Sequence, residues 1–193
     1  YSWADTTSGG PAFNYEYNAQ AMQVPLGTRG TSGTNGTDDS FATVPIGFIF
    51  PFYGASYSQI DVHSNGGLTF GAVDPLVYNH DCTSLTLPTP SILPYWVDLF
   101  PGGTTEQGSG IWYWTAGTAP ERYFVVEWYK ITLYREDNNY AASNLLTFEA
   151  KLFEDGRIEF HYEDLDGDTS NDDGAKAAVL IAGTPSEAST LSI

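Results

Sequence analysis

The sequence has few of the residues from which catalytic, redox and nucleic-acid sites are usually built. Its 193 residues include three histidines, one cysteine and one methionine, and 7 Lys and Arg stand against 24 Asp and Glu. The formal net charge of -17 would repel nucleic acids and anionic membrane surfaces, because both carry dense negative charge. We therefore expect no nucleic-acid partner.

The single cysteine, Cys82, excludes an intramolecular disulfide. We expect a buried, inert thiol, with an intermolecular bridge or a reactive thiol as alternatives. No run of about 18 apolar residues occurs, so we expect no membrane insertion. The chain begins at Tyr1 without a methionine, which we interpret as a mature or excised product. Asn35 opens an N-glycosylation sequon, Asn35-Gly36-Thr37, which is consistent with secretion.

Motifs of catalysis are missing too. The sequence contains no Gly-x-Ser-x-Gly elbow, no His-Glu-x-x-His and no paired cysteines. Its histidines are His63, His80 and His161. Asp98 and Glu127 stand in or beside apolar strands, where an acid-base pair would have a raised pKa, but bonding to the backbone or exposure to water is the simpler explanation. We expect no enzymatic activity.

The sequence is rich in alternating apolar residues, most clearly in Leu146 to Tyr162. This stretch predicts a β-hairpin that turns at Glu154-Asp155-Gly156. A three-residue loop with Gly156 in the left-handed conformation leaves one face wholly apolar, whereas a two-residue loop would mix apolar and charged residues on both faces. The predicted pairs are Leu152 with Ile158, Ala150 with Phe160, Phe148 with Tyr162, Lys151 with Glu159, and Glu149 with His161. The charged face should be solvated, and the apolar face implies a second layer.

Short strands parted by glycine and proline turns are predicted along most of the chain. They include Phe13 to Tyr17, Phe41 to Tyr57, a hairpin that turns at Ser64 to Gly67, Ile92 to Phe100, a hairpin from Gly110 to Trp128 with a bulge after it, and Ala177 to Ala182. Pro45 and Pro51 restrict their strand to a sheet edge, or end it. We predict an all-β fold, an antiparallel, jelly-roll-like β-sandwich of about ten short strands without significant helix. Residues 1–193 should form one domain.

An acidic stretch follows the predicted hairpin. Alternating aspartates resemble the opening of a calcium loop, and calcium takes six to eight oxygen ligands. The glutamate that ends an EF-hand loop is missing, so a solvated acidic turn is the alternative. The predicted calcium ligands are Asp164, Asp166, Asp168, Asn171 and Asp172.

Aromatic residues suggest two kinds of binding surface. Trp96 and Trp128 are expected in the core, but in the strand Ile111-Trp112-Tyr113-Trp114 one alternating pair must face outward, and Trp112 with Trp114 would form a stacking platform for sugars. Residues 1–18 carry Phe13, Tyr15 and Tyr17 at alternate positions. They would form an exchangeable N-terminal strand that adds to the open edge of a neighbouring subunit.

Several stretches occur in the order seen in nidogen-like extracellular modules. These stretches are Ile46 to Gly54, Val62 to Gly71, Leu93 to Leu99, Gly110 to Tyr113, Phe124 to Trp128 and Leu146 to Tyr162. The chain is most similar to the bacterial versions, which are often repeated in large secreted or cell-surface proteins. The resemblance covers about Phe41 to Ala182, and it departs from the animal modules in its single cysteine and in the Gly/Thr-rich loop at 26–40.

The resemblance implies an all-β module at the cell surface or outside the cell, without enzymatic activity. Such a module would act in adhesion or surface architecture, as a repeat of a surface protein or as the subunit of an extracellular assembly or filament. Its partners would be neighbouring subunits, matrix components or glycans. A carbohydrate-binding module that uses exposed Trp and Tyr is the alternative.

Overall fold

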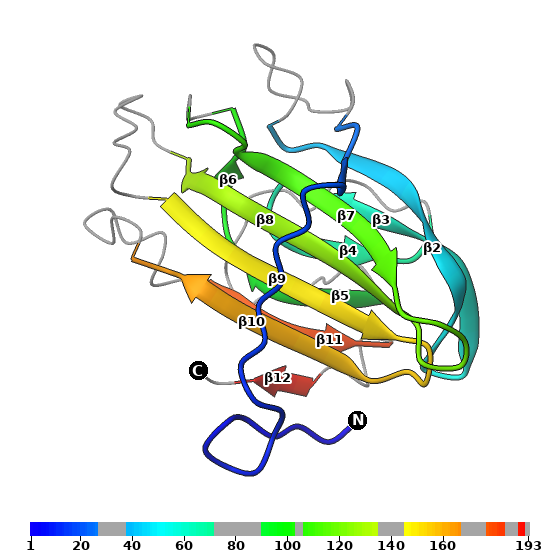
Figure 1. The fold of residues 1–193 in the computed structure, drawn as a ribbon. Coiled ribbons are helices and arrows are strands. Elements are labelled where there is room, and N and C mark those ends of the chain that lie inside the picture. The colour runs from blue at the N-terminus through cyan, green and yellow to red at the C-terminus, as the bar shows by residue number, and fades with distance from the viewer. Residues whose placement is uncertain are drawn as a thin grey trace.

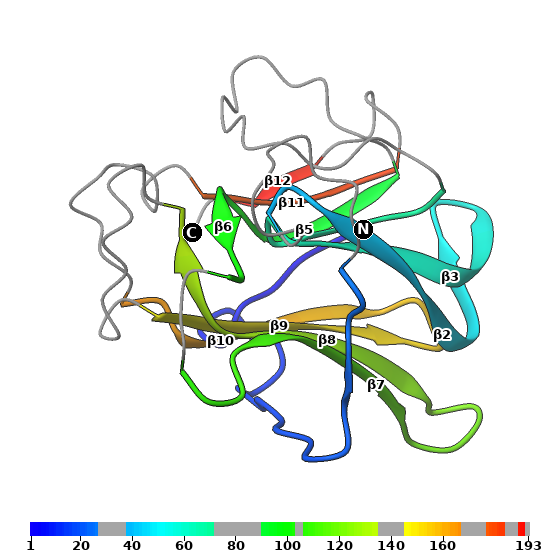
Figure 2. The same cartoon turned by 90° about the horizontal axis from the view of Figure 1, so that it is seen from above.

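The computed structural model describes residues 1–26, 38–71, 90–102, 106–134, 145–166, 177–183 and 189–191. In these residues it has twelve β-strands and no helix. The strands form two six-stranded sheets that face each other, and every pairing is antiparallel (Figures 1 and 2). The predicted all-β sandwich is therefore confirmed.

We call the layer nearer the viewer in Figure 1 the front sheet and the other layer the back sheet. The front sheet has the order β1 (Met22–Gln23), β7 (Gly110–Ala116), β8 (Tyr123–Leu133), β9 (Leu145–Phe153) and β10 (Ile158–Asp164), and β6 (Leu99–Phe100) pairs with β8. The back sheet has the order β12 (Ser189–Leu191), β11 (Ala178–Ala182), β5 (Ser91–Trp96), β4 (Gly67–Thr69), β3 (Ala55–His63) and β2 (Phe41–Phe52).

The hairpin of β9 and β10 has the predicted register. Leu152 pairs with Ile158, Ala150 with Phe160, Phe148 with Tyr162, Lys151 with Glu159 and Glu149 with His161. Gly156 has a φ of 91°, the left-handed conformation that the three-residue loop requires. The apolar face of this hairpin packs against the second layer, as predicted.

The other two predicted hairpins and the predicted edge strand are also present, but the hairpin of β2 and β3 was not predicted. Strand β2 contains Pro45 and Pro51 and lies at the edge of the back sheet. An edge strand has a neighbouring strand on one side only, so the missing N–H of a proline can face the open side without costing a hydrogen bond. The register of β8 with β9 shifts between Trp128 and Ile131, so the predicted bulge is present. Two strands were predicted too long. Phe41 to Tyr57 is divided by a turn at Tyr53 and Gly54 into β2 and the start of β3, and Ile92 to Phe100 is divided between β5 of the back sheet and β6 of the front sheet.

The core lies between the two sheets. Its largest fully buried side chains are aromatic and include Phe50, Phe52, Phe124, Trp128 and Phe148. Trp96, which was also predicted to be buried, packs in a second, smaller cluster with Leu93 and Leu180. Within the described residues no helix has the length and apolar character needed to cross a bilayer.

Candidate functional site: a polar strap across the front sheet

Residues 11–18, which we call the strap, cross the outer face of the front sheet. The strap runs over β10, β9 and β8 and then leads to β1, which pairs with β7 (Figure 1). Figure 2 shows it on the side of the front sheet that faces away from the back sheet. The predicted strand at Phe13 to Tyr17 is wrong. Because the strap runs across the strands, its backbone bonds to side chains of the sheet instead of to a neighbouring ladder.

The strap covers charged side chains that the sequence placed in solvent. Glu127 pairs across the strands with Glu149, which in turn pairs with His161, so the three form a row over β8, β9 and β10. The exposed fractions of these residues are only 1%, 0% and 3%, and that of Lys151 is 1%. The prediction of a solvated face is therefore wrong, because the local pattern of a hairpin carries no information about a distant segment that covers it.

Lys151 lies at the centre of the contact. Its Nζ is 2.8 Å from Glu16 Oε1 in the strap and 3.2 Å from Glu149 Oε1 in its own strand. The ammonium also donates a hydrogen bond to the carbonyl oxygen of Asn14. The ammonium thus has two hydrogen-bond acceptors, Asn14 and Glu16, and a second ion pair with Glu149, which is how a buried charge of this kind is stabilised.

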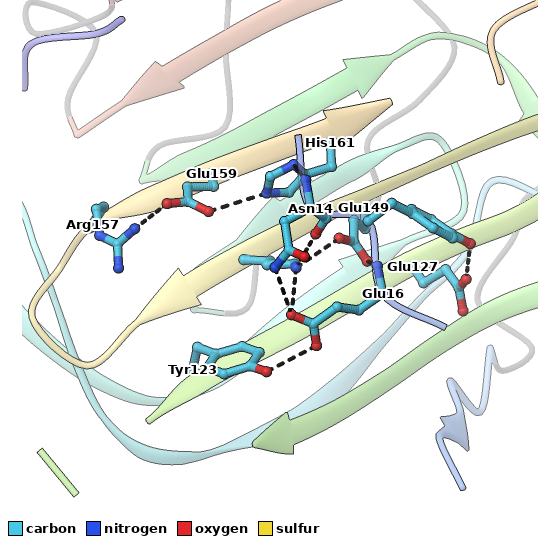
Figure 3. Close-up of polar contacts among 10 residues, drawn as sticks. Asn14, Glu16, Tyr123, Glu127, Glu149, Arg157, Glu159 and His161 are labelled. Carbon is cyan, nitrogen blue, oxygen red and sulfur yellow. Dashed lines mark hydrogen bonds and ion pairs between the residues drawn. The ribbon is translucent and has the colours of Figure 1, made fainter. Parts of the chain in front are cut away.

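The rest of the strap is held by further polar contacts (Figure 3). The Tyr15 hydroxyl donates to Glu127, and the Tyr123 hydroxyl donates to Glu16 Oε2 at 2.9 Å. The backbone N–H of Asn14 donates to Nδ1 of His161 at 3.2 Å. Since Nδ1 accepts, the N–H of His161 is on Nε2, which faces Glu159 Oε2 at 3.2 Å.

Burial changes the protonation of this row. It raises the pKa of Glu127 and raises that of Glu149 to about 7, although Lys151 opposes the latter shift. Burial also lowers the pKa of His161, so its imidazole is neutral. Beneath the strap the Glu149 carboxyl is therefore near its titration point at neutral pH, and the strap adds the negative Glu16 beside Lys151.

We expect the pH dependence of stability to report this carboxyl group. The ordinary pKa of glutamic acid is 4.5, so between pH 4.5 and about 7 the folded chain keeps a proton on Glu149 that the unfolded chain has lost. The free energy of unfolding therefore falls as the pH rises through this window, by about 3 kcal/mol at most. E149Q should lack this decline, while His63, whose pKa burial lowers to about 3, titrates equally in both proteins.

The measurement is urea unfolding of the wild type and E149Q at intervals from pH 4.5 to 8. The difference between the two free energies of unfolding should change across this range. A constant difference would contradict the raised pKa of Glu149.

Beside the strap a cleft of about 810 Å³ opens. It is lined by Tyr15, Tyr17, Glu106, Tyr129, Lys130, Leu145, Thr147, Glu163, Asp164 and Asp166. Tyr17 and Tyr129 lie with their ring centres 6.0 Å apart, and Lys130 Nζ is 3.8 Å from Glu106 Oε2. Tyrosine rings beside carboxylates can contact the rings and hydroxyls of a sugar.

The predicted site residues fall in different places. Tyr15 and Tyr17 line the cleft together with Asp164 and Asp166, which had been predicted as calcium ligands. Oδ1 of Asp164 accepts the Asp166 N–H at 2.9 Å, as in a simple turn. Asp168, Asn171 and Asp172 lie outside the described residues, as do Asn35, His80 and Cys82.

The tryptophans do not form the expected platform. Trp112 and Trp114 do face away from the core, because they pair with the outward Glu127 and Val125, but Trp114 is only 5% exposed. Trp112 is half-buried, and its Nε1 donates to the carbonyl of Gly108 at 3.0 Å.

Sequence reasoning missed the role of Glu16, Lys151 and Glu149. One signal was available, because Lys151 is one of only 7 basic residues and stands in the middle of a strand with Glu149 two positions away. A cation so placed in an acidic chain indicates a buried partner.

Comparison with known proteins gives one family match. No solved structure matches this chain. A family model described as NIDO related matches residues 14–193, which include the front and back sheets and most of the strap. The nidogen-related type is structural and non-enzymatic. Since the match covers most of the chain, the protein belongs to the NIDO-related family.

Proposed function

We propose that the protein is an extracellular structural module that assembles with further copies of itself by exchanging the strap. Membership in the NIDO-related family supports an extracellular, non-enzymatic role. The observation that carries the proposal is the distribution of exposed apolar side chains. Among the described residues six large hydrophobic side chains are exposed, and all but Ile49 belong to residues 1–22: Tyr1, Trp3, Phe13, Tyr17 and Met22.

Exposed aromatic residues on one segment are typical of an interface. Tyr1, at the start of the chain, contacts Phe52 and Tyr53 at the end of β2. Phe13 and Tyr17 lie on the strap, which is held to its own sheet by hydrogen bonds and an ion pair, and each contributes one ring contact. The same contacts would form if the strap of a second copy occupied the sheet. Exchange therefore costs little in the contacts themselves, and the outer faces of the aromatic rings become available to the neighbour.

A hinge for this exchange lies between the strap and β1. Asn18 closes a turn there, because its carbonyl accepts the Ala21 N–H at 3.0 Å and its side chain accepts the Gln20 N–H at 2.9 Å. Val24 is buried beyond this turn, and its N–H donates to Ile111 at 2.8 Å. The strap can thus leave the sheet when the turn opens, while the chain from β1 onward stays in place.

A charge exchange between strap and sheet tests the proposal. E16K alone places a second cation on the strap beside Lys151, so strap and sheet repel each other. K151E alone places a carboxylate on the sheet beside Glu16 of the strap, so they repel each other as well. A mixture of the two proteins can form a reciprocal dimer in which both contacts are complementary. We expect each variant alone to remain a monomer and the mixture to reach about twice the mass of 21.0 kDa by light scattering after gel filtration.

The matched control is the double variant E16K/K151E, in which the attraction returns within one chain. It should have the same oligomeric state as the wild type, at lower stability because Glu149 loses the ammonium of Lys151 beside it. A mixture that stays at the mass of the monomer would contradict strap exchange. If the wild type instead binds immobilised oligosaccharides and remains monomeric, the carbohydrate-binding alternative stands, with Tyr17 and Tyr129 at the cleft as its stacking residues.

A further inference from the structure

Three aspartates meet where the chain passes from the back sheet to the front sheet. Asp38 and Asp39 lie just before Ser40, the residue that precedes β2, and Asp98 lies between β5 and β6. One carboxylate oxygen from each lies within 4.8 Å of the other two. Oxygens bound to one calcium ion at about 2.4 Å can lie up to about 4.8 Å apart, so a single ion can reach all three.

A second observation points to a missing cation. Oδ1 of Asp38 is buried and receives no hydrogen bond from the described residues. Burial and the neighbouring charge of Asp39 raise the pKa of Asp38. A buried carboxylate oxygen without a donor is costly in a folded protein, and an ion is one of the groups that remove this cost.

The surroundings hold the carboxylates in place. Asn65 donates from Nδ2 to Asp39 Oδ1 at 2.8 Å and accepts the Leu99 N–H at 3.0 Å. It therefore connects Asp39, before β2, to the segment that follows Asp98. Ser40 and Ser64 exchange hydrogen bonds of 3.0 and 2.8 Å, and the carbonyl of Asp98 accepts the Tyr134 N–H at 2.8 Å. Such partners orient the ligands of a metal site before the ion arrives.

We propose that Asp38, Asp39 and Asp98 bind a calcium ion that ties the start of β2 to the passage between the two sheets. Carboxylates are hard oxygen ligands, and calcium tolerates the irregular geometry that two separate segments impose better than magnesium does. The ion relieves the repulsion between the three acids and provides the partner that Asp38 Oδ1 lacks.

Calcium titrations of the full chain test the site. Extracellular calcium modules bind with Kd values on the order of 10⁻⁴ to 10⁻³ M, so 10 mM calcium should raise the Tm by roughly 3 to 10 °C. The same concentration of magnesium should raise it less. Terbium should bind in place of calcium, with luminescence sensitised by the protein and displaced by added calcium.

The variants separate this cluster from the other acids. D38N and D98N should lose most of the shift caused by calcium, and D38N should also have a higher Tm than the wild type when calcium is absent. D164N, at the end of β10 where the acidic stretch begins, should keep the full shift. The proposal is overturned if calcium and terbium leave the wild type unchanged, or if the shift persists in D38N and D98N and disappears in D164N.

Discussion

K151M is expected to lower the free energy of unfolding by about 3 to 5 kcal/mol at pH 8. Lys151 is 1% exposed and is the only cation that lies within 4 Å of the buried Glu149 among the described residues. Removing it leaves Glu149 and its cross-strand neighbour Glu127 as two buried carboxylates without a counter-charge. The ammonium also binds Asn14 and Glu16, so the strap loses its central contact.

The size of the effect distinguishes two arrangements of the strap. If the strap did not cover the sheet, Lys151 would be an ordinary surface lysine, and its replacement would cost about 1 kcal/mol or less. The measurement is urea unfolding followed by circular dichroism, with unchanged m values as the sign that only stability has changed. A loss below about 1 kcal/mol would exclude the buried ion pair.

The double variant E149Q/K151M is the matched control. Replacing both members of a buried ion pair is often nearly neutral, and in this variant the only buried carboxylate left in the row is Glu127, to which the Tyr15 hydroxyl donates. The double variant should therefore recover at least half of the stability that K151M loses. Equal losses in both would mean that Lys151 stabilises the protein through packing and the strap alone, without Glu149.

The period-two pattern predicted the strands because it reflects local geometry. The register of β9 with β10 followed from one requirement, that Leu152 and Ile158 share a face, and Gly156 permitted the turn. The prolines of β2 placed it at an edge for an equally local reason, the missing N–H. The bulge after Trp128 could be read from a break in the alternation.

The strap could not be predicted in this way, since its contacts are distant in sequence. Tyr15 and Glu127 are 112 residues apart, and Asn14 and His161 are 147 apart. The alternation at Phe13, Tyr15 and Tyr17 resembles a strand, but in the strap these three side chains do not share a face: Tyr15 contacts Glu127 of the sheet, whereas Phe13 and Tyr17 are exposed.

The aspartate cluster was missed for a related reason. The sequence predicts one strand from Ile92 to Phe100, which hides the change of sheet at Val97 and Asp98. Asp98 then looks like an isolated acid in an apolar strand. Only the passage between the layers brings it to Asp38 and Asp39, about 60 residues earlier in the chain.

W128A is expected to destabilise the protein by about 3 to 5 kcal/mol. Trp128 is fully buried between the sheets and stacks on Phe148, with ring centres 5.0 Å apart. Its Nε1 donates to the carbonyl of His63 at 3.1 Å, so one side chain of the front sheet is bonded to the backbone of the back sheet. Alanine would leave a cavity in the core and remove this connection.

Two further variants separate packing from hydrogen bonding. W128F keeps a stacked ring on Phe148 but removes the donor to His63, and its smaller ring leaves a smaller void, so we expect a loss of about 1 to 3 kcal/mol. I49A removes a side chain that is 59% exposed and should change stability by less than about 0.5 kcal/mol. If W128F cost as much as W128A, the link between the sheets would be the dominant contribution; if W128A cost as little as I49A, Trp128 would not be in the core. Because domains are stable by only about 5 to 15 kcal/mol, the loss predicted for W128A is a large part of what holds the two sheets together.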